Sequence, residues 1–202
     1  MDLGSIPSEG TRNILVFNIG KNMFSFIILI TILLLLLFLL FFIVAQFYSI
    51  IFKGFAPFIS SGEEVLHKVI SEINAQEKTV FELGCGRAGF LRSLRKKYPK
   101  ARLIGVELLS FPYLVAQIQN SLSKSGIEIR KEDIFKTDIS KADIIYCYLN
   151  VDTMRKLEPK FKTECKKGAQ IVSFQFKLPS VKPERTIELD EGKNKVYFYT
   201  IK

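Results

Sequence analysis

The longest apolar run of the chain covers residues 22–52 and contains no charged side chain. An α-helix needs about 20 apolar residues to cross ~30 Å of hydrocarbon. Lys21 and Lys53 stand at the two ends of the run, where their ammonium groups can reach water. The pattern predicts one membrane-spanning helix from Met23 to Phe52, preceded by a polar and disordered tail over 1–21.

Two other interpretations of this run were weighed. A cleavable signal peptide has an apolar core of about 7–15 residues and a small-residue cleavage site. The run is longer than that, and Val44-Ala45-Gln46-Phe47 is a poor site. A buried core helix is excluded, because residues 53–202 are too few to enclose so apolar a rod. A retained membrane anchor is therefore favoured.

Residues 53–78 form a linker and a first soluble helix. The linker, 54–61, is too apolar for a free tether. Ser61 or Gly62 can cap the helix, and Glu63 and Glu64 suit the positive end of its dipole. Apolar residues then recur with a period of 3.6, which is typical of an amphipathic helix: Val65, Leu66, Val69, Ile70 and Ile73.

From residue 79 onward, short apolar runs alternate with helical patterns. Such alternation predicts βαβ units and a parallel sheet, hence an α/β fold. The last two runs flank a Gly192 turn and predict an antiparallel hairpin at one edge. We predict helices over 90–98 (stopped by Pro99), 110–124 (capped by Ser110 and ended by Gly126) and from Asp152 or Thr153 to Gly168. The predicted strands are 79–83, 102–107, 127–130, 143–148, 169–174, 185–189 and 195–201.

The net charge of +9 lies entirely in residues 53–202, which hold 27 Lys and Arg against 18 Asp and Glu. This excess suits anionic headgroups beside a membrane, or an acidic or nucleic-acid partner, and equally a solvated surface. Six basic residues gather near the end of the helix 90–98, where cations suit the dipole. Only Tyr98 interleaves with them, so a solvated helix end is favoured over a nucleic-acid patch. The six are Arg92, Arg95, Lys96, Lys97, Lys100 and Arg102.

The chain has three cysteines and one histidine, and none of them indicates a metal site. Cys85, Cys147 and Cys165 lack CxxC spacing and are odd in number, which favours free thiols in a reducing compartment. His67 lies on the first soluble helix and is interpreted as structural or solvated.

The candidate chemistry begins where the first strand ends, in Glu82-Leu83-Gly84-Cys85-Gly86-Arg87-Ala88-Gly89. Glycines at a strand end let backbone amides approach a ligand beside a helix N-terminus. The GxGxxG spacing alone also fits a dinucleotide, which leaves an NAD-dependent oxidoreductase open. Glu82, however, would repel a pyrophosphate and attract a cation. Glu107 closes the second strand, where it can accept hydrogen bonds from both ribose hydroxyls.

These motifs resemble those of the class I, seven-stranded S-adenosylmethionine-dependent methyltransferases, whose Rossmann-like sheet ends in an antiparallel hairpin. The resemblance covers nearly all of 79–202. It implies that the glycine loop holds the methionine end of the donor, that Glu107 holds the ribose and that Leu108 packs on the adenine. Asp133, after the third strand, matches the adenine-edge contact. The full donor set that it implies is Glu82, Gly84, Cys85, Gly86, Glu107, Leu108, Asp133 and Ile134.

Residues outside the glycine loop are similar to those of the small membrane-anchored protein-lysine methyltransferases that modify the ATP synthase c-subunit and the adenine nucleotide carrier, and to their prokaryotic relatives. The similarity includes Ala56-Pro57-Phe58-Ile59, the segment 142–149, Leu157-x-Pro159-Lys160 and Lys167-Gly168-Ala169. Two places depart from that family. Ser60-Ser61 replace the usual Pro-Thr, and no acid follows Gly86 in the loop.

The resemblance implies methyl transfer to a lysine amine of a membrane protein near the bilayer. Such an enzyme aligns the reactants and desolvates the nucleophile. Tyr148 and Asn150, at the exit of the fourth strand, are the candidate catalytic residues, because their oxygens can orient an amine; Asp152 can help to neutralise it. Tyr146 and Tyr148 also fit a buried core, and Asp152 fits a helix cap.

Three alternatives stay open: methylation of a lipid or small amphiphile, a domain that binds the donor without turnover, and an anchored scaffold. Because the donor is made in the cytosol, we expect the Lys53 end of the anchor to face the cytoplasm. The expected partners are the bilayer, through 22–52, and a membrane-protein substrate.

Overall fold

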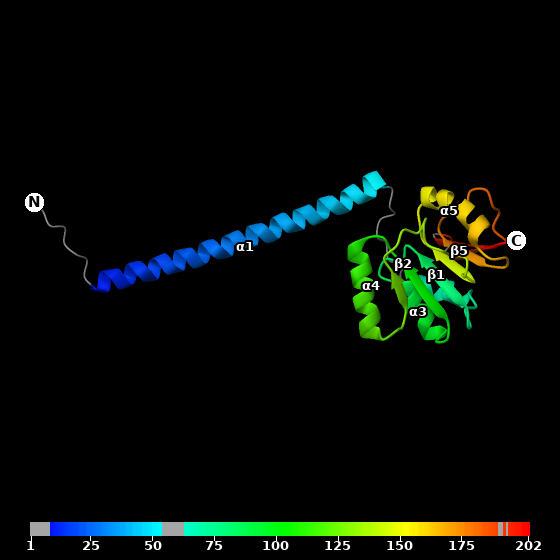
Figure 1. The fold of residues 1–202 in the computed structure, drawn as a ribbon, viewed down its shortest axis with the longest axis horizontal. Coiled ribbons are helices and arrows are strands. Elements are labelled where there is room, and N and C mark those ends of the chain that lie inside the picture. The colour runs from blue at the N-terminus through cyan, green and yellow to red at the C-terminus, as the bar shows by residue number, and fades with distance from the viewer. Residues whose placement is uncertain (1–8, 54–62, 190–191, 193) are drawn as a thin grey trace, which may run out of the picture. The chain divides into compact units, whose positions relative to one another are not determined.

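The computed structural model describes residues 9–53, 63–189, 192 and 194–202, and the chain divides into two units, Met1–Lys53 and Gly54–Lys202. The first unit holds the single helix α1, Glu9–Lys53 (Figure 1). The second holds four helices and seven strands in its described part. The predicted linker 54–61 and the predicted cap at Ser61 or Gly62 lie outside the described residues.

Helix α1 is 45 residues long, and its segment Asn22–Ala45 is long and apolar enough to cross a membrane. None of this segment is buried within the molecule. The hydroxyl of Thr31 donates to the carbonyl of Ile27 (2.9 Å), so the helix itself satisfies this polar group. A signal sequence near an N-terminus meets the same criteria of length and composition, so α1 is a candidate span.

Helix α1 begins earlier than predicted. We expected residues 1–21 to be disordered, but 9–21 form its first turns. No proline stands between Pro7 and Pro57, and apolar residues return at 14–17. The sequence therefore contains no proline that would break the helix between Glu9 and the apolar run. The disorder prediction was wrong for residues 9–21.

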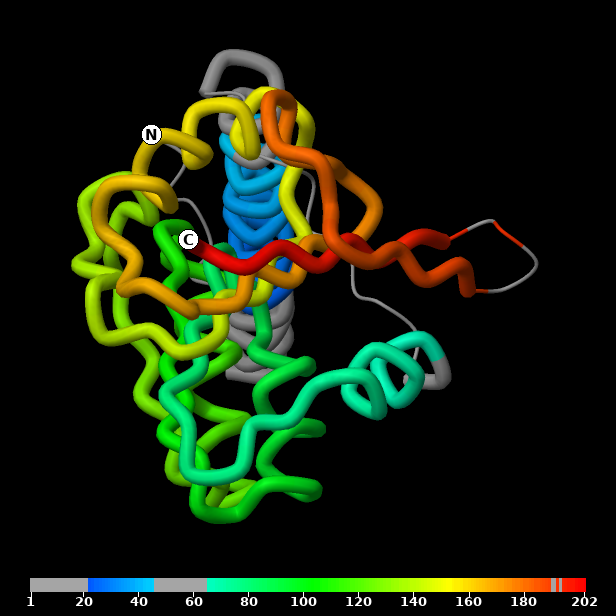
Figure 2. Tube along the Cα trace, turned by 90° about the vertical axis from the view of Figure 1, so that its right-hand side faces the viewer, coloured from blue at the N-terminus to red at the C-terminus, as the bar shows by residue number. Residues whose placement is uncertain are grey.

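The second unit is built on one seven-stranded sheet with the order β3-β2-β1-β4-β5-β7-β6. The pairs among β1 to β5 are parallel, and β7 runs antiparallel to both β5 and β6. The predicted mixed sheet with an antiparallel edge is therefore confirmed, and Figure 2 shows the β6–β7 hairpin, orange to red, at one side of the domain. The strands are Thr79–Leu83 (β1), Arg102–Val106 (β2), Glu128–Arg130 (β3), Ile144–Cys147 (β4), Gln170–Phe174 (β5), Arg185–Leu189 (β6) and Asn194–Thr200 (β7).

The sheet separates two apolar cores, because successive strand residues point to opposite faces. Val80 and Ile144 lie in the core shared with α2, Glu63–Ser71, and α3, Gly89–Lys97. Their neighbours Phe81 and Ile145 lie in the core covered by α5, Val151–Glu164. Helix α4, Ser110–Ser123, packs on the α3 side through Ala116. The β3–β4 and β5–β6 connections, 131–143 and 175–184, contain no helix.

The ends of α4 and α5 differ from the predicted ones, because other residues than those predicted cap these helices. Helix α4 has Leu109 as its N-cap without a side-chain cap, so the predicted Ser110 cap is wrong. Its C-cap is Lys124, at φ 49°, rather than Gly126. Helix α5 is capped by Asn150, neither by Asp152 nor by Thr153, and ends at Glu164 before reaching Gly168.

Candidate active site

The predicted donor residues lie at or after the carboxyl ends of β1, β2 and β3, and the candidate catalytic residues follow β4; these four strands are neighbours in the sheet. Such ends meet at one edge of the sheet, which is where α/β proteins bind ligands. Glu82 on β1 pairs in register with Gly105 of β2 and with Tyr146 of β4. The sheet therefore brings the glycine loop, Glu107 and the exit of β4 to the same edge.

The glycine loop is tied to the end of β2 by its own amides. The N–H groups of Gly84 and Cys85 both donate to the carbonyl of Val106, each at 2.9 Å. The next amide, that of Gly86, donates to Oε2 of Glu107 at 2.9 Å. Gly84 has a φ of 73°, and a Cβ there would stand 2.8 Å from Leu149, so only glycine suits this position. These three successive N–H groups thus donate to acceptors within the protein, so they are not available to bind a pyrophosphate at this loop.

Glu107 joins the glycine loop to the start of α4. Its Oε2 accepts from Gly86, and its Oε1 accepts from the Leu109 N–H at 2.8 Å. Burial raises the pKa of this carboxyl above its usual value, against the lowering effect of the N–H groups of Leu109, Gly86 and Leu108. A carboxylate has four acceptor directions, so Glu107 can accept a further hydrogen bond from a ligand hydroxyl.

Glu82 is the most unusual group at this edge. Its side chain is only 7% exposed, and its Oε2 is buried without a hydrogen-bond partner among the described residues. Burial raises the pKa of Glu82 well above its usual value, while the Leu91 N–H and the charge of Arg92 lower it. A buried oxygen that accepts no hydrogen bond destabilises the fold, unless a ligand or another group donates a hydrogen bond to it. A ligand with an ammonium group would do so.

Cys85 contributes to the loop through its backbone, while its thiol belongs to the core. The side chain is 4% exposed, and burial raises the pKa of the thiol. A Cβ on Gly105 would stand 2.8 Å from the Cys85 sulfur, so the middle of β2 must be glycine for the loop to close. Gly105 was not among the predicted site residues, although an isolated glycine inside a strand signals such a close approach.

The predicted adenine contacts follow β2 and β3, which are neighbours in the sheet. Leu108 comes directly after Glu107 and is 39% exposed. Asp133 forms a turn, in which its Oδ1 accepts from the Phe135 N–H at 2.9 Å and its carbonyl accepts from Lys136 and Thr137. Ile134 is half-buried against the core on the α5 side. These residues lie at the expected edge, and their contact with an adenine stays a prediction.

The two candidate catalytic residues have structural contacts of their own. Asn150 caps α5, since its Oδ1 accepts from the Thr153 N–H at 2.8 Å. Tyr148 is half-buried, with its ring perpendicular to that of Phe174 at a centroid distance of 4.7 Å. Tyr146 is a core residue, 2% exposed and stacked on Phe90 at 3.8 Å. Their roles in catalysis stay predictions.

Arg92, which was predicted only as part of a solvated helix end, is a further charged group beside the predicted donor residues. It is half-buried in α3, and its guanidinium donates to the carbonyl of Arg87. Burial lowers the pKa of Arg92, while the nearby Glu82 raises it. Arg92 thus balances part of the buried charge of Glu82 and orders the loop before α3. Its position three residues after Gly89, on the first turn of the helix, was the signal available in the sequence.

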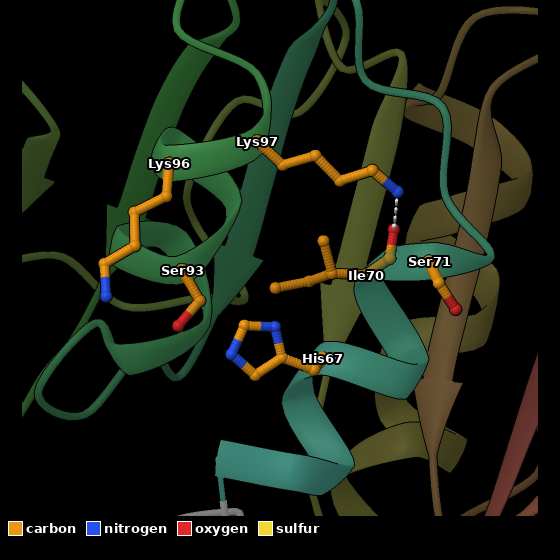
Figure 3. Close-up of a pocket in the computed structure, with 6 residues that line it drawn as sticks. All are labelled: His67, Ile70, Ser71, Ser93, Lys96 and Lys97. Carbon is orange, nitrogen blue, oxygen red and sulfur yellow. Dashed lines mark hydrogen bonds between the residues drawn. The ribbon is translucent and has the colours of Figure 1, made fainter.

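A pocket of about 390 Å³ lies elsewhere, between α2 and α3 (Figure 3). Lys97 reaches across it to donate to the carbonyl of Ile70 (3.1 Å), and Ser71 donates to that of Lys68 (2.7 Å). These contacts close the end of α2. His67 and Ser93 line the same pocket, which contains none of the predicted donor residues. The chemistry of Glu82 and Glu107 therefore locates the candidate site better than the shape of this cavity does.

A family model and a curated relative match the part of the chain that contains these residues. The model of the ANTKMT methyltransferase domain matches residues 82–185, which include Glu82, the glycine loop and Glu107. A protein-lysine N-methyltransferase of Saccharolobus islandicus (strain REY15A) is 26% identical over 152 residues, and the match covers 72% of this chain and 93% of that protein.

Solved structures share the fold. An RNA methyltransferase from Salinibacter ruber, solved in complex with S-adenosyl-L-homocysteine, has a TM-score of 0.67 at 24% identity and covers 71% of this chain and 94% of its own. A ribosomal protein L11 methylase from Lactobacillus delbrueckii subsp. bulgaricus has a TM-score of 0.57 at 14% identity, with 69% and 78% covered. Similarity at this level establishes a Rossmann-like methyltransferase fold for the second unit.

Proposed function

The chain belongs to the family of ANTKMT methyltransferase domains, and on that premise we propose that it methylates a lysine of a membrane protein with S-adenosylmethionine as donor. The observation that carries the donor is the buried Glu82 carboxylate, whose Oε2 has no partner among the described residues. The protein-lysine N-methyltransferase of Saccharolobus islandicus supports lysine as the acceptor.

The residues present fit this donor. S-adenosylmethionine would supply a methyl group bound to a sulfonium sulfur: the neutral amine would form a bond to the methyl carbon while the carbon–sulfur bond breaks and S-adenosylhomocysteine leaves. The donor also carries an ammonium group and two ribose hydroxyls. Glu82 offers a buried acceptor for the ammonium group, and Glu107 offers the remaining acceptor directions of its two oxygens for the hydroxyls. The amides of Gly84, Cys85 and Gly86 are already used within the protein, which disfavours NAD at this loop.

The proposed work of the protein is alignment and desolvation. A lysine side chain must lose a proton and enter the site in line with the methyl group. The Tyr148 hydroxyl, at the exit of β4, can accept a hydrogen bond from the neutral amine. Asn150, whose Oδ1 caps α5, keeps that exit in place by fixing the start of the helix. The exposed carboxylate of Asp152 can attract the charged amine before it enters.

Anchoring to a membrane is the second part of the proposal, and the 24-residue segment Asn22–Ala45 supports it. The donor is a cytosolic metabolite, so the second unit lies on the cytoplasmic side. The chain between α1 and α2 is nine residues long, which keeps the site near the bilayer and narrows its substrates to what lies there.

The test uses the full chain in native membranes with methyl-labelled donor. We expect label in ε-N-methyl-lysine of a membrane protein, detected by mass spectrometry, and its loss in Glu82→Ala. Label that enters only lipid would make the enzyme a lipid methyltransferase. No label, despite donor binding measured by calorimetry, would make it a binding protein. Digestion of the second unit by protease added outside sealed cells would contradict the cytoplasmic location.

A further inference from the structure

Helix α4 exposes large apolar side chains along one side. Leu114, Ile118 and Leu122 are 56, 51 and 79% exposed. They recur at intervals of four residues, which places them on one face of a helix. This exposed face extends from residue 114 to residue 122, or about 12 Å along the helix. We call these three residues the α4 outer face.

The opposite side of α4 is the one that contacts the sheet, and it is small or polar. Pro112 and Ala116 are buried there. The Gln117 side chain donates to the carbonyl of Ile129 (3.3 Å), and that of Asn120 donates to Ile127 (2.8 Å). Two polar side chains of α4 therefore bond to the fold, whereas the large apolar side chains of its outer face point away from the core. An ordinary amphipathic surface helix turns its large apolar residues toward the core instead.

Such a face has a cost in water, and soluble proteins seldom keep one without a partner. Burying Leu or Ile side chains away from water is favourable, because it removes apolar surface from the solvent. Figure 1 shows α4 at the side of the second unit, where no other described helix of that unit covers it. An apolar surface outside the described residues can therefore cover the α4 outer face.

Charge and chain connectivity identify that surface as a bilayer. No charged residue occurs from Leu108 to Ser123, and Lys124 follows at once, so the helix can enter an interface without burying a charge. The excess of nine positive charges in residues 53–202 favours anionic headgroups. The nine residues 54–62 allow at most about 35 Å between the end of α1 and the start of α2, so an anchored α1 keeps the domain within reach.

We propose that the α4 outer face lies in the headgroup region of the membrane and orients the donor site toward it. Glu107 holds the start of α4 through Leu109, so the helix and the donor site move as one body. The proposal rests on the anchor assigned under the proposed function. The α4 outer face would be a second contact with the membrane. A single helix and a linker leave the domain free to rotate, and this second contact would fix its orientation.

The test places an environment-sensitive fluorophore on the full chain in vesicles that contain anionic lipid. Ile118→Cys carries the label on the α4 outer face, and Lys156→Cys, on the exposed side of α5, is the matched control. A third label at Leu35→Cys reports on α1. The native thiols Cys85, Cys147 and Cys165 are buried, so the unsubstituted chain gives the background.

We expect the label at 118 to show a blue-shifted emission, quenching by lipid-borne nitroxide and loss of quenching by aqueous iodide. The label at 156 should behave in the opposite way. A label at 118 that stays accessible to iodide, while the label at 35 lies in lipid, would overturn the docking and leave the anchor intact. Protection at 118 that disappears when the protein-to-lipid ratio is lowered would overturn it in favour of a second copy. Iodide access at both 35 and 118 would overturn anchor and docking together.

Discussion

Helices α4 and α5 are each 14 residues long and lie on opposite faces of one sheet, yet they use their two sides in opposite ways. Helix α5 buries Met154, Leu157 and Phe161 and carries exposed ion pairs such as Arg155–Asp152, at 2.9 Å. Helix α4 buries Pro112 and Ala116 and exposes its large apolar residues. Apolar periodicity therefore predicts a helix in both cases, but identifies the core-facing side only in α5.

The starts of the two helices differ as well. The cap of α5 is local, because Asn150 accepts from an amide three residues further along. Glu107 fixes the start of α4 and at the same time accepts from Gly86, 21 residues back in the chain. Asn150 caps its own helix, whereas Glu107 joins the start of α4 to the glycine loop. The second arrangement couples the candidate donor site to the fold.

The largest expected difference between the two helices is in packing. Leu157→Ala in α5 removes a fully buried side chain and should lower the free energy of unfolding by about 2–5 kcal/mol. Ile118→Ala in α4 removes an exposed one and should change it by less than about 0.5 kcal/mol in detergent. Denaturant titration followed by circular dichroism measures both. Equal losses would mean that the outer face of α4 is covered within the domain.

The next effect concerns the coupling through Glu107. In Glu107→Gln, one of the two carboxylate acceptors becomes an amide, so the N–H of Gly86 or Leu109 loses its bond, at a cost of about 1–3 kcal/mol. Affinity for S-adenosylhomocysteine should fall by about tenfold for each 1.4 kcal/mol that this change removes from binding. Calorimetry measures the affinity. The control is Glu128→Gln, an exposed partner of Arg102 and Arg130, which should leave affinity unchanged. An unchanged affinity in both variants would contradict the role of Glu107.

Glu82 lies on β1, between the strands that precede the two helices, and we expect a pH effect from it. Its folded-state pKa is raised by burial. Its stabilising contribution is therefore complete below the unfolded pKa, about 4.3, and is lost as pH rises through the folded pKa. Glu82→Gln, which stays neutral, should remove this loss and make the donor-free protein more stable than the wild type at neutral pH.

The measurement is the difference in free energy of unfolding between wild type and Glu82→Gln across pH 4 to 8. The same variant should bind S-adenosylhomocysteine more weakly, because the neutral amide attracts the ammonium group less. A pH-independent difference would show that Glu82 has an ordinary pKa. Greater stability together with weaker binding would show that the buried carboxylate serves the ligand at the expense of the fold.

Much of the fold followed from periodicity, because the strands of this sheet are short apolar runs separated by glycine or proline. The β1 prediction matches the structure at both ends, and β2 and β5 differ by a residue at one end. Predicted helix ends failed where the deciding group lies outside the helix, as with Glu107, which accepts from the Leu109 N–H before α4. The predicted start of α1 was wrong because a helix that needs no tertiary contact continues until a residue such as proline ends it.

The donor site was predictable to the extent that it depends on strand ends. Glu82 and Glu107 could be located from the sequence, because parallel strands finish at a common edge. Gly105 and Arg92 were not singled out, since their importance lies in contacts with Cys85 and Glu82 that appear only after folding. Asn150 was selected for its chemistry, whereas its position directly before α5 also suits a cap.

The smallest expected effect distinguishes these two roles of Asn150. Asn150→Ala should lower the free energy of unfolding by about 1 kcal/mol, as the loss of a helix cap does. Asn150→Asp keeps an acceptor for the Thr153 N–H and should restore most of that stability. If Asn150 acts only by fixing the start of α5, Asn150→Asp should also restore the turnover rate. If its amide orients the lysine amine, turnover should stay low in Asn150→Asp although stability returns, and the residue would then be catalytic as well as structural.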